Sequence, residues 1–71
     1  MKTLTFRVVK RKLEKAGFAQ AGQTGSHIKF AKITNHETRT AIVPKHREVA
    51  SGTLRSILRQ AGLSEEEFEK L

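Results

Sequence analysis

Apolar residues near the N-terminus recur at spacings of three, four and three positions, which places them on one face of a helix. They are Phe6, Val9, Leu13 and Ala16. Thr5 fits the N-cap, because its hydroxyl can accept a hydrogen bond from a first-turn amide, and Gly17 fits the C′ position that ends a helix. The pattern predicts a helix over residues 6–16.

The clearest strand pattern lies in residues 27–33, where polar and apolar side chains alternate from His27 to Phe30 before Ile33 breaks the pattern. Ile28 and Phe30 fall on one face of the expected strand, whereas His27 and Lys29 fall on the other. Such alternation is typical of a strand with one buried face.

Two further extended segments flank this strand. Residues 34–37 are polar and turn-like, and residues 38–43 are rich in β-branched side chains before Pro44 closes the segment, so a hairpin is predicted. On the other side the pattern over 18–23 is weak. There Gly22 and Thr24-Gly25 are interpreted as strand-end and turn residues.

The last third of the chain predicts two helices. One apolar face is formed by Leu54, Ile57, Leu58 and Ala61. This face predicts a helix over 52–61 that Gly62 ends, after a basic, irregular connection over 45–52. Ser64 to Glu67 then forms a capping box, with Leu63 and Phe68 placed as a hydrophobic staple, so a short helix is expected from residue 65 to the end.

The expected architecture is therefore one α+β domain over residues 1–71, in the order α-β-β-β-α with a short extra C-terminal helix. A sheet with one apolar face suits a two-layer domain in which both longer helices cover the same side. The opposite face, with His27 and Lys29, is left to solvent or to a ligand.

Composition narrows the function. A chain of 71 residues has one thin core and no room for a deep cofactor pocket, which excludes a large multi-substrate enzyme. The chain has no Cys, and its three His lack the i, i+4 spacing of a helical metal pair, so we expect neither a metal site nor a cofactor. Apolar runs are too short for a membrane span or a signal peptide, and the default location is the cytoplasm.

The net charge of +7 is unevenly distributed. Residues 1–60 carry 13 basic and 3 acidic side chains, whereas residues 61–71 carry one Lys and four Glu. A basic domain favours a polyanion such as nucleic acid, although an acidic protein or an anionic membrane is also compatible. The polar face of the first helix carries Arg7, Lys10, Arg11 and Lys15. This ridge either binds phosphates or is simply the solvated side of the helix.

Gly25-Ser26-His27 is the most informative tripeptide, because a glycine, a hydroxyl and an imidazole meet where a turn enters a strand. An imidazole titrates near neutral pH and can move a proton to or from RNA, which supplies its own 2′-hydroxyl nucleophile. The alternative is an ordinary strand histidine. Ser26 can donate to a phosphate, but its position in the turn favours a turn-capping role.

Other basic residues are candidates for holding an RNA backbone. Lys29 shares the face of His27, and Lys45 and Arg47 follow Pro44. His46, between them, either touches phosphate or lines a loop. His36 falls in the predicted hairpin turn, where exposure explains it. With four Phe and no Tyr or Trp, recognition by shape and phosphate is favoured over base stacking.

Several of these segments together resemble the HicA family of toxins from HicA–HicB toxin–antitoxin pairs. The matching segments are Leu13–Phe18, Gly25–His27, Val43–Pro44 with His46, and Gly52–Leu63. The resemblance covers residues 4–64. The acidic tail over 65–71 lies outside it.

The resemblance implies a fold like that of double-stranded-RNA-binding domains. It also implies ribosome-independent mRNA cleavage by a metal-free ribonuclease whose catalytic histidine is His27, and neutralisation by a HicB antitoxin bound over the active face. Two other functions remain open. One is a non-catalytic RNA-binding module of the same fold, and the other is a degenerate family member retained only to bind a partner.

Overall fold

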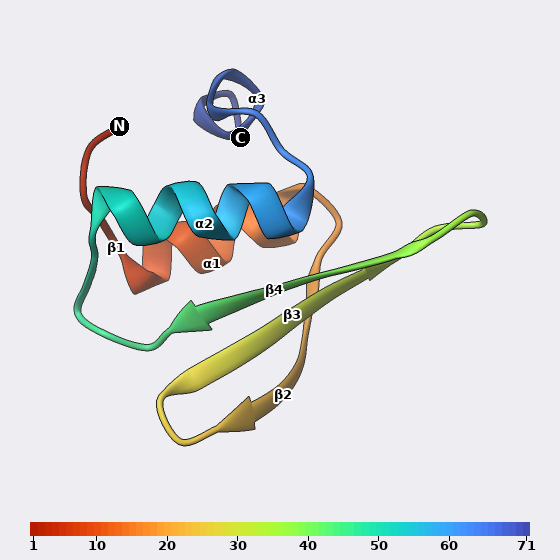
Figure 1. Cartoon of the computed structure of the whole chain (residues 1–71), viewed down its shortest axis with the longest axis horizontal. Coiled ribbons are helices and arrows are strands. Elements are labelled where there is room, and N and C mark those ends of the chain that lie inside the picture. Colours follow the sequence, from red (N-terminus) through yellow and green to blue (C-terminus); the bar gives the residue numbers. More distant parts are fainter.

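The computed structural model describes residues 1–71. It contains three helices and five strands, which follow one another as β1 (Leu4–Thr5), α1 (Phe6–Lys15), β2 (Ala19–Thr24), β3 (His27–Ile33), β4 (Thr38–Pro44), β5 (Glu48–Val49), α2 (Ser51–Ala61) and α3 (Glu65–Glu69). Strands β2, β3 and β4 form an antiparallel sheet in that order, and Figure 1 shows α1 and α2 together on one side of it. The predicted α+β order with a short C-terminal helix is confirmed.

Helix α1 begins at Phe6, as its sequence predicts, and ends at Lys15, one residue before the predicted end. The Thr5 hydroxyl accepts a hydrogen bond from the Val8 amide at 3.3 Å, which satisfies one free first-turn donor. Gly17, with φ of +100°, then turns the chain away from the helix. Val9 and Leu13 are fully buried on the face that packs against the sheet.

The core lies between the helices and the covered face of the sheet. Ile28 and Phe30 of β3, with Ala41 and Val43 of β4, supply the sheet side of that core. The remaining buried residues come from the helices and from the segments that flank them, namely Val9, Leu13, Phe18, Val49, Leu54, Ile57, Leu58, Ala61 and Phe68. All thirteen are apolar, so the core contains no buried polar or charged side chain.

The opposite face of the sheet carries no helix. His27 and Lys29 are exposed there, as the alternation predicts. Ile33, which breaks the sequence pattern, is an apolar residue on this same face and is 80% exposed, and Ile42 of β4 lies there with 40% exposure. We call this surface the open face.

The two edges of the sheet differ in whether another element covers them. At the β4 edge, the side-chain oxygen of Gln60 accepts a hydrogen bond from the Ile42 amide at 2.9 Å, so α2 closes that edge. At the other edge every residue of β2 is exposed. Thr24 is the last residue of β2 and Gly25 lies in the turn that follows, as predicted. The expectation for Gly22 is wrong, because Gly22 lies within β2, where the register shifts between Gln20 and Gly22.

The connection predicted to be irregular over 45–52 contains a short strand. In it Val49 pairs with Leu4 and Glu48 pairs with Thr5, which forms the two-stranded sheet β1–β5. Helix α2 begins at Ser51, one residue earlier than predicted, and Gly62 ends it with φ of +73°. No helix of the structure is long and apolar enough to cross a membrane.

Two basic side chains on the covered side of the sheet lie beside the C-terminal ends of α1 and α2. Lys32 and Arg39 are cross-strand partners on β3 and β4. A Cβ at Gly17 would stand 3.1 Å from the Lys32 side chain, and one at Gly62 would stand 2.7 Å from the Arg39 guanidinium. Cations near helix C-termini interact favourably with the exposed carbonyl dipoles, which gives both side chains a structural role.

Helix α3 is short but firmly capped. Ser64 and Glu67 form the predicted capping box, with the Ser64 hydroxyl accepting from the Glu67 amide at 3.0 Å and the Glu67 carboxylate accepting from the Ser64 amide at 2.8 Å. The Lys12 ammonium of α1 donates to the carbonyl of Phe68 at 3.0 Å and lies 5.2 Å from that ring. This lysine fastens the C-terminal helix to α1.

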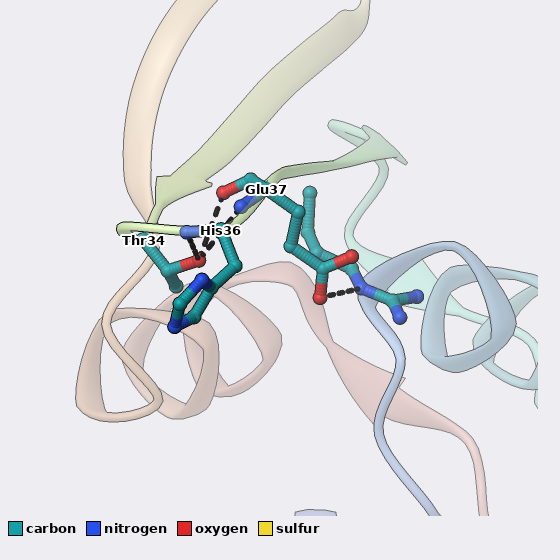
Figure 2. Close-up of polar contacts among 4 residues, drawn as sticks. Thr34, His36 and Glu37 are labelled. Carbon is teal, nitrogen blue, oxygen red and sulfur yellow. Dashed lines mark hydrogen bonds and ion pairs between the residues drawn. The ribbon is translucent and has the colours of Figure 1, made fainter.

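The β3–β4 hairpin is closed by its own side chains, as Figure 2 shows. The Thr34 hydroxyl donates to the carbonyl of Glu37 at 3.0 Å and accepts from the amides of His36 and Glu37 at 3.3 and 3.1 Å. Arg39 pairs with the Glu37 carboxylate at 3.2 Å. His36 is exposed in this turn, as the sequence predicts.

Candidate functional site

The tripeptide Gly25-Ser26-His27 forms the turn between β2 and β3 and the first residue of β3. Gly25 has φ of +58°, a left-handed conformation that glycine adopts without penalty. The Gln23 side-chain amide donates to the Gly25 carbonyl at 2.9 Å and supports the turn. His27 is thereby held at a fixed point at the end of the sheet, with its side chain exposed.

His27 and Lys29 share the open face and are two residues apart on β3. The neighbours of His27 across the sheet are Thr24 and Pro44, and those of Lys29 are Gly22 and Ile42. No atom lies within 4 Å of the place where a Gly22 Cβ would stand, so the surface beside Lys29 is uncovered. An imidazole and an ammonium therefore face the same open surface, where both are accessible to an external ligand.

The β4–β5 loop lies next to the turn that carries His27. The Lys45 amide donates to the Ser26 carbonyl, and Pro44 is the cross-strand partner of His27. Figure 1 shows this loop and the β2–β3 turn at the same end of the sheet, away from the β3–β4 hairpin. Lys45 and Arg47, both exposed, are thus brought to the neighbourhood of His27.

The same loop borders a hollow of about 390 Å³ against the start of α1. We call it the basic hollow, and its lining residues are Thr5, Phe6, Arg7, Lys45, His46 and Arg47. The sequence pattern places Arg7 on the polar face of the first helix and His46 in a basic loop, but it does not predict that the two line one hollow. Two basic segments of the sequence, Arg7 in the first helical turn and the Lys-His-Arg run over 45–47, are the signal that could have indicated this hollow.

The remaining predicted contacts lie on α1 and are not gathered with His27. Arg11 and Lys15 are exposed and Lys10 is half-buried. They continue the row that begins with Arg7, because residues three and four positions apart are neighbours on a helix surface. Only through Arg7 does this ridge reach the basic hollow.

The ion pairs of the chain lie elsewhere. They join Arg39 to Glu37, Arg55 to Glu65 and Lys70 to Glu66. No cation of the basic hollow, and neither Lys29 nor the basic residues predicted on α1, has an acidic partner. These side chains are therefore available to an external anion.

Other features of the surface do not coincide with this site. The largest hollow, of about 510 Å³, lies beside α3 and is lined by Met1, Lys2, Leu4, Lys12, Phe68 and Glu69. No group of three or more His, Cys, Asp or Glu side chains converges as a metal site would require. The pKa of Glu67 is lowered, first by its hydrogen bond from the Ser64 amide, but this carboxylate belongs to the α3 cap.

Comparisons with known proteins agree with the resemblance seen in the sequence. A comparison with curated proteins finds no match to this chain. The family model for the HicA toxin of bacterial toxin–antitoxin systems matches residues 6–63, from the first residue of α1 to just beyond α2. The match covers the sheet, both longer helices, the tripeptide before β3 and the basic loop. The chain therefore belongs to the HicA family of bacterial toxin–antitoxin toxins.

Proposed function

We propose that this toxin is an endoribonuclease that cleaves mRNA, with His27 as general acid or base and without a metal ion. The observation that carries the proposal is the position of His27, which is exposed at the start of β3, on the open face, and beside cations that have no acidic partner. Family membership supports a toxin with an antitoxin partner. Cleavage of RNA is the chemistry that these residues favour.

The reaction uses a nucleophile that RNA already contains. As base, the His27 imidazole takes the proton of a ribose 2′-hydroxyl, whose oxygen then attacks the adjacent phosphorus. The bond from phosphorus to the 5′-oxygen breaks, and that oxygen takes a proton, which an imidazolium in the same position supplies if His27 acts as acid. The products are a 2′,3′-cyclic phosphate and a 5′-hydroxyl. Water exchanges the other proton.

The surrounding cations hold and stabilise the phosphates. Lys29 extends from the same face as His27, where its ammonium can offset negative charge that grows on the phosphate in the transition state. Ser26 lies in the turn directly before His27, and its hydroxyl can donate to a phosphate oxygen. Lys45 and Arg47 lie beyond Pro44, and Lys10, Arg11 and Lys15 extend the basic surface along α1. In this role they bind the RNA backbone irrespective of sequence.

The antitoxin is proposed to be of the HicB type and to bind over the open face. The body of the toxin is strongly basic, so an acidic antitoxin surface is electrostatically complementary to it. Binding there would cover His27 and Lys29 together and exclude RNA.

Cleavage of a mixed-sequence mRNA in EDTA tests the proposal. His27→Ala should lower the cleavage rate about 10²–10⁴-fold, since general acid–base assistance is typically of that size, while RNA binding and folding stay close to normal. His36→Ala is the matched control, because its imidazole lies in the hairpin turn at the other end of β3. Wild-type products should carry cyclic phosphate ends, and added antitoxin should stop the reaction.

Two results would contradict the catalytic role. Equal cutting by wild type and His27→Ala would remove the imidazole from the chemistry, and a requirement for added metal would replace the mechanism. If wild type binds RNA and leaves it intact, the protein is a non-catalytic RNA-binding module of the same fold.

A further inference from the structure

The basic hollow gathers more positive charge than any other concave part of the molecule. Arg7, Lys45 and Arg47 all line it, together with the imidazole of His46, and no acidic side chain does. Glu48 follows Arg47 in the sequence but neither lines the hollow nor forms an ion pair. The three cations therefore face a common volume without a counter-charge.

This arrangement favours an anion as occupant. Like charges held near one another repel, and an anion placed between them attracts each of them and so offsets that repulsion. The first turn of α1 adds to the effect, because it contains no acidic residue and its amides form the positive end of the helix dipole. An anion with several oxygens, such as a phosphate, can accept from more than one of these donors.

Backbone contacts connect the hollow to the β2–β3 turn that precedes His27. Lys45 both lines the hollow and donates its amide proton to the carbonyl of Ser26, the residue before His27. Pro44, the residue before Lys45, lies opposite His27 in the sheet. These two backbone connections link the loop that lines the hollow to the turn before His27. A group bound in the hollow is therefore held at a fixed position relative to the imidazole.

We propose that the basic hollow is a phosphate-binding site that fixes the RNA strand beside His27. The inference rests on the proposed function in taking RNA as the ligand. The phosphate is either an internal phosphodiester of the strand or the monophosphate at its 5′ end, and the two sources share the chemistry that the hollow recognises. Arg7, Lys45 and Arg47 are binding residues in this site.

The first experiment uses inorganic phosphate as the probe and requires no cleavage. Phosphate is titrated into ¹⁵N-labelled wild-type protein while the backbone amide signals are followed. We expect the signals of Phe6, Arg7 and Lys45 to shift in a saturable manner, and Arg47→Gln to weaken that response about tenfold or more, as expected when a charged hydrogen-bond donor is lost. Arg59→Gln removes an equal charge from exposed α2 and should leave the response unchanged.

The second experiment uses 2′-O-methyl oligonucleotides, which lack the nucleophile and cannot be cut by the proposed route. Arg47→Gln should lower their affinity about tenfold relative to Arg59→Gln. If a 5′-phosphate raises wild-type affinity and Arg47→Gln abolishes that gain, the bound group is the terminal monophosphate. If Arg47→Gln lowers the affinity for oligonucleotides with and without a 5′-phosphate by the same factor, the bound group is an internal phosphodiester.

Cleavage assays then separate this inference from the proposed reaction. Arg47→Gln should raise KM for RNA with little change in kcat, whereas His27→Ala should lower kcat. A wild type that does not cut RNA, but whose hollow responds to phosphate, would overturn the reaction and leave the site. Equal losses in Arg47→Gln and Arg59→Gln, or the absence of shifts at Phe6, Arg7 and Lys45, would overturn the site. Unchanged thermal midpoints confirm that both variants are folded.

Discussion

The two faces of β3 contrast sharply although their residues alternate along one strand. Ile28 and Phe30 are buried beneath the helices, whereas His27 and Lys29 face solvent with no helix over them. The covered face holds only apolar side chains in its centre, and the open face presents the candidate chemistry. Stability and the proposed activity are therefore assigned to neighbouring residues that point in opposite directions, which allows single substitutions to separate them.

The largest expected effect comes from truncating the covered face. Phe30→Ala removes a fully buried aromatic ring from a thirteen-residue core and should destabilise the protein by about 3–5 kcal/mol. Because small domains have little stability to lose, much of the variant should be unfolded at room temperature. Denaturant unfolding measures the change, and a loss below about 1 kcal/mol would show that Phe30 is not packed as described.

Lys29→Ala is the matched substitution on the adjacent residue. An exposed side chain away from the core should change stability by no more than about 0.5 kcal/mol. Cleavage and RNA affinity should both fall, because Lys29 faces the proposed path of the phosphate. If Lys29→Ala were as unstable as Phe30→Ala, or as active as wild type, the two faces would not have the separate roles described.

Substitutions on α1 test how far the proposed RNA-binding surface extends beyond the open face. If Arg11 and Lys15 each contact a phosphate, replacing both with Gln should weaken binding and reduce the salt slope, log K against log salt, by about 0.7 for each lost single-strand contact. The measurement is RNA affinity over a series of salt concentrations. An unchanged slope would assign this part of the ridge to solvation and confine binding to the end of the sheet near His27.

The smallest effect concerns pH and involves neither face. The pKa of Glu67 is lowered in the folded state, so its carboxylate stabilises α3 above the ordinary glutamate pKa, and that contribution is lost as the pH falls through the lower folded value. Thermal midpoints recorded from neutral to acidic pH should decline less in Glu67→Gln, whose neutral amide cannot titrate. Parallel curves for the two proteins would exclude a contribution from this group.

The elements with a strong local signal were predictable. The helix that starts after Thr5, the alternation of β3, the turn around Thr34 and the capping box at Ser64 each depend on side chains close in sequence, and all four are confirmed. Gly62 ended its helix as expected. Local rules of capping and periodicity suffice where the partners are a few residues apart.

The failures involve partners that are distant in sequence or segments without a pattern. Strand β2 has six exposed residues and a register shift, so no alternation marked it. The pairing of Leu4 with Val49 spans most of the chain and involves two-residue strands, which leave no periodic trace. For the same reason the fastening of α3 by Lys12 was not visible, nor was the approach of Arg7 to the loop that carries Lys45.

The position of α3 also bears on how the toxin meets a polyanion such as RNA. Its four glutamates lie on the side of the molecule away from the β2–β3 turn, as Figure 1 shows, and Lys12 keeps them there. The protein is thus an electric dipole as well as a cation. In its field an approaching polyanion tends to arrive at the end that carries His27 and away from α3. Encounters are oriented before any contact forms, and this guidance weakens as salt shortens the range of the field.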